Sequence, residues 1–148
     1  MARMEVNGLD ALIDDLAALA ELPDSVVEGI LNAEADVVVP AQRSEIENRW
    51  SGPYSMGISA KSIKKDSKVR GLGDGRLYHH INIYPQGSRK RNGKDISNAE
   101  IAFINEYGAP TRGIAARPAI STATAKSEEQ AVEAGEKVYN AYLDSKNL

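Results

Sequence analysis

The chain has 148 residues, 42% of them hydrophobic and 26% charged, which suits one globular domain spanning residues 1–148. It contains no cysteine, which excludes disulfide bonds, thiolate nucleophiles and cysteine-ligated metal centres. Its net charge of −3 does not by itself indicate a nucleic-acid or membrane binder, and no stretch approaches ~18 apolar residues, so we expect a soluble, non-exported protein.

The charges are distributed unevenly along the chain. Residues 1–40 carry nine acidic side chains and one basic one, whereas residues 61–95 carry ten basic and three acidic ones. We take this asymmetry as the first indication of function, because segments of opposite charge can meet on neighbouring copies of a protein.

The N-terminal part of the chain is predicted to be helical. Apolar residues recur at three- and four-residue spacing from Leu9 to Ala20, which predicts an amphipathic helix ending near Leu22. A second helix is predicted from Pro23 toward Trp50. Because a proline removes one backbone hydrogen bond and clashes with the preceding turn, we expect Pro40 to kink this helix or break it in two.

The middle of the chain is predicted to form a β-hairpin followed by a loop. Residues 62–70 and 76–84 are the two arms, joined by a glycine-rich turn at 71–75, and apolar and polar residues alternate along the second arm. Residues 85–97 contain proline, glycine and four basic side chains, which predicts an exposed, mobile basic loop.

The C-terminal part is predicted to return to helix. Ser97 and Glu100 have the spacing of a capping box, which predicts a short helix over 98–107 with Gly108 as a left-handed C-cap, although a strand is the competing interpretation. Pro118 can open a long final helix, whose alanine-rich stripe predicts close packing against another helix. The predicted fold is α+β: N-terminal helices and a long C-terminal helix packed on a small antiparallel sheet with a basic hairpin and loop.

The residue pattern favours a protein without catalytic, cofactor or metal sites. His79 and His80 occupy adjacent strand positions, which point to opposite faces and do not chelate one metal together. The glycines of residues 71–75 lack the spacing of a phosphate-binding loop. Glu100 and Glu106 fall on different faces of the predicted helix, and Glu100 suits capping better than catalysis.

The basic side chains between residues 61 and 94 leave three interpretations open. It is a solvated edge strand and loop, a surface that docks another protein, or a site that contacts nucleic-acid phosphates through charge alone. The candidate docking or DNA-facing residues are Lys61, Lys64, Lys65, Lys68, Arg70, Arg89, Lys90, Arg91 and Lys94.

The segment from Ala99 to Gly108, followed by residues 114–120, resembles a tailed-bacteriophage morphogenesis family, the tail-completion or head–tail joining proteins. Members show an alanine, then Glu-Tyr-Gly, then Ala-Arg-Pro opening the last helix. The matching positions are Ala102, Glu106, Tyr107, Gly108, Ala116, Arg117 and Pro118. The order of weaker matches, from Gly8-Leu9-Asp10 to Ser62-Ile63, extends the resemblance over nearly the whole chain.

The resemblance implies a structural virion protein rather than an enzyme. Its copies would form a homo-oligomeric ring, a hexamer or a dodecamer, at the phage neck after assembly in the host cytoplasm. The expected partners are the head-closure or connector protein and the tail tube or tail terminator protein, with non-specific contact to passing DNA and none to a membrane. The alternative is a small accessory protein that binds nucleic acid through its basic patch.

We expect the motif residues to be architectural. Gly108 permits a turn with positive φ, and Tyr107 packs against the fold. Glu106 pairs with Arg117 or Arg112, so that the chain enters the helix opened by Pro118 at a fixed angle.

Overall fold

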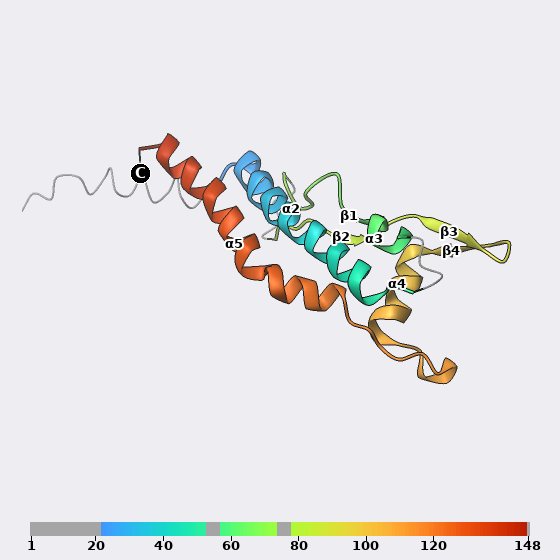
Figure 1. Ribbon diagram of the computed structural model, residues 1–148. Helices are drawn as coiled ribbons and strands as arrows, with labels where there is room; N and C mark the ends of the chain where they lie inside the picture. Colours follow the sequence, from blue (N-terminus) through green and yellow to red (C-terminus); the bar gives the residue numbers. More distant parts are fainter. Residues whose placement is uncertain (1–21, 53–56, 74–77, 148) are drawn as a thin grey trace, which may run out of the picture.

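The computed structural model describes residues 22–52, 57–73 and 78–147, and the helix predicted from Leu9 lies outside these ranges. The fold is α+β, as predicted, with two separate two-stranded antiparallel sheets (Figure 1). In chain order the elements are α2 (Asp24–Arg49), α3 (Ile58–Ser62), β1 (Ile63–Lys65), β2 (Ile83–Pro85), β3 (Ser88–Arg91), β4 (Lys94–Ser97), α4 (Asn98–Tyr107), the 3-10 helix η1 (Pro110–Arg112) and α5 (Ile120–Ser145).

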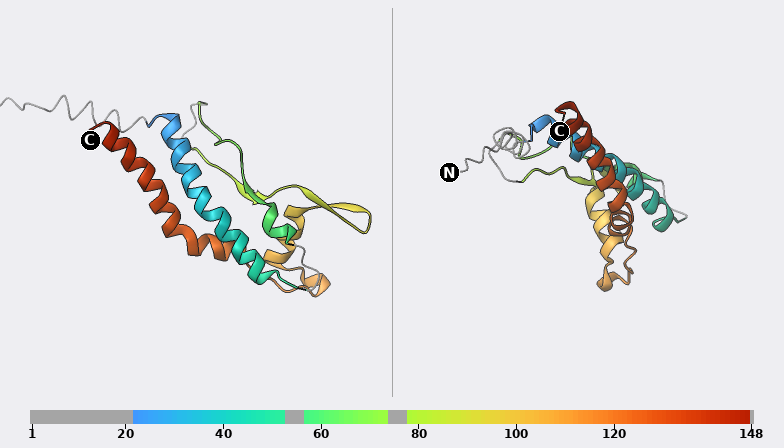
Figure 2. Two further views of the ribbon diagram at one scale, coloured as in Figure 1. Left: turned by 45° about the horizontal axis from the view of Figure 1, so that its top comes forward. Right: turned by 90° about the vertical axis from the view of Figure 1, so that its left-hand side faces the viewer.

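The two long helices, α2 and α5, pack side by side in opposite directions and form the spine of the molecule (Figures 1 and 2). The buried residues of α5 are small and recur every four positions: Ala123, Ser127, Ala131 and Gly135. Small side chains at this spacing form one stripe that lets two helix backbones approach closely. The close helix packing predicted from the alanine-rich stripe is confirmed.

Pro40 does not break the second helix, so the predicted break is wrong. Residues Asp24–Arg49 form one continuous helix with Pro40 inside it. Pro40 and Asp36 are both exposed, so water can bond the Asp36 carbonyl that loses its helical partner. Packing along the buried side of α2, where Gln42 donates to Thr124 on α5 at 3.0 Å, stabilises the helix across this position.

The predicted first hairpin is present, although its strands are shorter than expected. Strand β1 pairs with β2 antiparallel, with Lys64 opposite Tyr84, and an isolated bridge joins Arg70 to His80. The predicted alternation is confirmed: His79, Ile81 and Ile83 are half-buried, whereas the residues between them are exposed. The turn residues 74–77 lie outside the described ranges.

The segment predicted as a mobile loop is instead a second β-hairpin. Strands β3 and β4 pair antiparallel in a register that places Arg91 opposite Lys94. The turn residues Asn92 and Gly93 have φ values of 51° and 76°. Positive φ at both central residues is the property of a type I′ turn, the connection that matches the twist of two-residue hairpins. Most residues of the segment are exposed, as predicted, and the hairpin extends beyond α3 and α4 (Figure 1).

The hydrophobic core lies where the end of α2 meets α3, α4 and the start of α5. It consists of Ile46, Trp50, Ala60, Ile63, Ala102 and Ala119, and Ile63 and Ala119 are fully buried. Helix α4 confirms the helical interpretation of residues 98–107, and Ser97 accepts a hydrogen bond from the Glu100 amide as an N-cap. Among the described residues, no helix has the length and apolar character that crossing a membrane requires.

Candidate functional site

The motif residues meet in a joint between α4 and α5, and Glu106 is its centre. This carboxylate is 6% exposed and lies beside the first turn of α5. One oxygen accepts hydrogen bonds from the amides of Ala119 and Ile120 at 2.8 and 2.9 Å. The other accepts from the amide and the hydroxyl of Ser121 at 2.9 and 2.5 Å. Glu106 therefore caps α5 from a different helix, satisfying amides that have no partner within α5.

The hydrogen bonds also fix the charge of this carboxylate. Burial acts to raise the pKa of Glu106, but the bonds from Ser121 and from the amides of Ala119 and Ile120 outweigh it. The net effect is a pKa below the ordinary value, because donors to a carboxylate favour its ionised form. All four hydrogen bonds come from α5 or its N-cap, so Glu106 links α4 to α5.

Gly108 ends α4 in a conformation that glycine alone adopts readily. Its φ is 76° and its ψ is 178°, so the positive φ is confirmed but the predicted left-handed helical conformation is not. A Cβ atom at this position would lie 2.7 Å from the carbonyl oxygen of Ile114 and 2.8 Å from the amide nitrogen of Ala116. The return path of the chain therefore passes too close to Gly108 for any side chain.

Arg117 ties the joint to α2 rather than to Glu106. Its guanidinium donates to the Asn105 side chain at 2.5 Å and to the Arg49 carbonyl at 3.4 Å. Its own carbonyl accepts from the Trp50 indole at 2.7 Å, and its amide donates to the Asn105 carbonyl at 2.7 Å. The ion pair predicted between Glu106 and Arg117 or Arg112 is wrong, because the α5 amides take the carboxylate.

Two further motif residues differ from expectation. Tyr107 does not pack into the fold: it is 65% exposed and its ring lies 4.9 Å from that of Phe103, which is itself exposed. Pro118 does not open α5: the helix begins two residues later, at Ile120, with Ala119 as its N-cap. Ser121 was not predicted to belong to this site, and its only signal in the sequence is its place shortly after Pro118.

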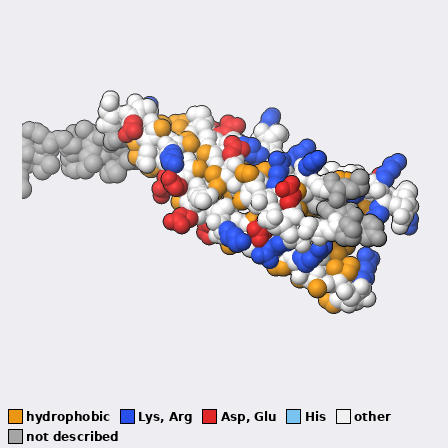
Figure 3. Space-filling view, viewed as in Figure 1, with side chains coloured by type: hydrophobic (Ala, Val, Ile, Leu, Met, Phe, Trp, Pro, Cys, Tyr) orange, Lys and Arg blue, Asp and Glu red, His pale blue; other side chains and the backbone are white. Residues whose placement is uncertain are grey.

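The structure divides the predicted basic surface into two groups. Three of its members have partners within the fold: Lys65 pairs with Asp36 at 2.7 Å, Arg70 pairs with Asp66 at 3.1 Å, and Arg89 donates to Asn98 and Ser59. The others are exposed: Lys61 on α3, Lys64 on β1, Lys68 after it, and Lys90, Arg91 and Lys94 on the second hairpin. Lys and Arg side chains gather over the half of the molecule that carries the sheets (Figure 3).

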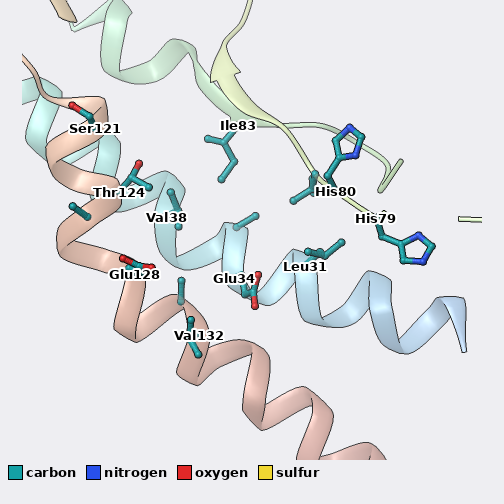
Figure 4. Close-up of a pocket in the computed structure, with 14 residues that line it drawn as sticks. Leu31, Glu34, Val38, His79, His80, Ile83, Ser121, Thr124, Glu128 and Val132 are labelled. Atoms are coloured by element: carbon teal, nitrogen blue, oxygen red, sulfur yellow. The ribbon is translucent and has the colours of Figure 1, made fainter. Parts of the chain in front are cut away.

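A groove of about 720 Å³ lies between α2, α5 and the strand segment 79–83 (Figure 4). Its apolar lining includes Leu31, Val38, Ile83 and Val132, while Glu34 and Glu128 enter from the two helices. Burial raises the pKa of Glu34. The described residues contain no group of three or more side chains with metal-ligand chemistry.

No family model, curated protein or solved structure matches this chain.

Proposed function

We propose that this chain is a structural virion protein that forms a ring at the neck of a tailed bacteriophage and joins the tail tube to the capsid connector. The observation that carries this function is the joint. Glu106, Gly108 and Arg117, on which the family resemblance rests, come together at one place and hold three helices at a fixed angle. The polar side chains of this motif make their hydrogen bonds within the fold, which supports an architectural role.

The exposed apolar surface supports an oligomer. Phe103 and Tyr107 form an exposed aromatic pair on α4, and Val132 is 49% exposed beside the groove. The Phe103–Tyr107 pair gives each copy an exposed apolar surface that a neighbouring copy would cover. In a ring, each copy would present one surface to a different surface of the next copy, and the contact repeats until the ring closes.

The partners follow from this role. The ring would contact the head-closure or connector protein on one side and the tail tube or tail terminator protein on the other. DNA would pass through the lumen, and the place of the protein would be the neck of the virion. This role requires no catalytic residue and no cofactor.

Two measurements test the role. Electron microscopy of the purified chain should show rings with a central opening, and a phage lacking the chain should yield filled heads and free tails that do not join. Supplying the wild-type chain or the surface variant Glu129→Gln should restore joined particles. Monomers at every concentration, together with joined particles formed without the chain, would contradict the role.

A further inference from the structure

Two positively charged side chains lie opposite each other at the tip of the second hairpin. Arg91 and Lys94 lie directly opposite across the β3–β4 pair, on either side of the Asn92–Gly93 turn. Like charges at opposed positions destabilise a strand pair. Both side chains belong to exposed residues, and within the described ranges no ion pair involves either of them. A ligand with negative charge would attract both side chains and offset their repulsion.

The register gathers the charge on one face of the hairpin. Side chains two residues apart on a strand share a face, so Arg89 and Arg91 lie on the same side, together with Lys94. Burial and, to a smaller extent, the charge of Arg91 lower the pKa of Arg89, which agrees with this proximity. Lys90 occupies the other face, where Asp95 is its cross-strand partner.

The base of the hairpin is anchored, so the tip is presented at a fixed place. Arg89 donates to the Asn98 side chain at 2.8 Å and to the Ser59 hydroxyl at 2.9 Å. Asn98 is buried and in turn donates to the Gln86 carbonyl at 2.8 Å. These contacts join the hairpin to α3 and α4. A ligand at the tip therefore finds its cations already in position.

We propose that Arg91 and Lys94 form a binding site for the phosphate backbone of double-stranded DNA. Residues 89–95 contain no apolar side chain, whereas the centre of a protein–protein interface is apolar. Phosphate binding needs only charge and hydrogen-bond donors, and the arginine fork and the lysine ammonium supply both. A two-stranded ribbon is also narrow enough to enter the major groove. Because the proposed contacts are to phosphates, which carry no sequence information, we expect the affinity to depend little on the DNA sequence.

A salt titration of DNA affinity tests the site. Fluorescence anisotropy with a labelled mixed-sequence duplex gives the dissociation constant of the full chain between about 50 and 200 mM salt. The logarithm of the binding constant should fall linearly with the logarithm of the salt concentration. Replacing both residues, Arg91→Gln with Lys94→Gln, should reduce that slope by about 2 for each engaged hairpin, because each phosphate contact contributes ~0.9.

A matched variant controls for net charge. Lys126→Gln with Lys137→Gln removes the same two charges from α5, where both lysines make exposed ion pairs, and should leave the slope unchanged. Thermal unfolding checks that the hairpin variant is folded, and its melting temperature should hold or rise once the repulsion is gone. Equal slopes in the two variants, or a wild-type chain without DNA affinity, would overturn the site. If the hairpin variant keeps its DNA affinity but no longer joins heads to tails, the tip docks a protein instead. Purified monomer and ring serve equally well, so failure here leaves the proposed neck function standing.

Discussion

Replacing Glu106 by glutamine is expected to destabilise the fold by about 3 kcal/mol. Glutamine has nearly the same shape, but one carboxylate oxygen becomes an NH₂ group, which cannot accept from the amides it meets. If that group faces Ala119 and Ile120, two of the four hydrogen bonds are lost. Hydrogen bonds to charged groups contribute roughly 1.5–3 kcal/mol each, so two of them give about 3 kcal/mol at the lower end.

This loss of stability can be measured as a decrease in the melting temperature. The entropy of unfolding is about 2.1 cal/mol/K per residue, so unfolding a chain of 148 residues increases the entropy by about 0.3 kcal/mol/K. The midpoint of thermal unfolding should therefore fall by about 10 °C at neutral pH. The control is Glu129→Gln on the exposed side of α5, which should change stability by less than about 0.5 kcal/mol.

The loss should also depend on pH, with a sign fixed by the lowered pKa of Glu106. A carboxyl group whose pKa is lower in the folded state stabilises the fold above its unfolded pKa, near the ordinary value of 4.5. That stabilisation disappears as the pH falls through the folded pKa. The gap between wild type and Glu106→Gln should therefore be widest at neutral pH and narrow in acid. Calorimetric melting temperatures that coincide at neutral pH, or differ by the same amount at every pH, would refute the capping role.

Three further substitutions test the joint and its surroundings. Gly108→Val should lower the free energy of unfolding in urea by about 3 kcal/mol or more. The backbone conformation favours glycine, and a Cβ would lie 2.7 Å from the Ile114 carbonyl oxygen. Unchanged stability would rule out this turn. Asn98→Ala should cost about 2 kcal/mol, because Arg89 loses one of its two side-chain partners and the Gln86 carbonyl loses its side-chain donor. Hydrogen exchange should show faster opening of the β3 and β4 amides than of α5, and slow β3 and β4 exchange in this variant would contradict the anchor. Trp50→Phe should cost about 1–2 kcal/mol, measured by chemical unfolding, because the Arg117 carbonyl loses its indole donor while an aromatic ring remains. A stability equal to wild type would show that this bond contributes nothing.

The sequence by itself determined the elements that local physics controls. Ser97 caps α4 because a side-chain oxygen three residues before an amide can reach it without any tertiary contact. The alternation of His79, Ile81 and Ile83 with exposed residues follows from the two-residue period of extended backbone. The second hairpin also has a local signal, because Asn92–Gly93 is a typical type I′ turn sequence. We predicted a loop there because the surrounding side chains are basic, but this strand pair needs no buried face.

Only the tertiary structure decided which residues meet. The continuity of α2 through Pro40 depends on packing against α5, which outweighs the loss of one backbone hydrogen bond on the exposed side. The partners of Glu106 lie 13 to 15 residues away, and they depend on the path of the chain from Gly108 to Ala119, which no periodicity encodes. From the sequence we paired Glu106 with Arg117 or Arg112, because opposite charges attract. In the fold, the unsatisfied amides at the start of α5 are closer to the carboxylate and bind it instead.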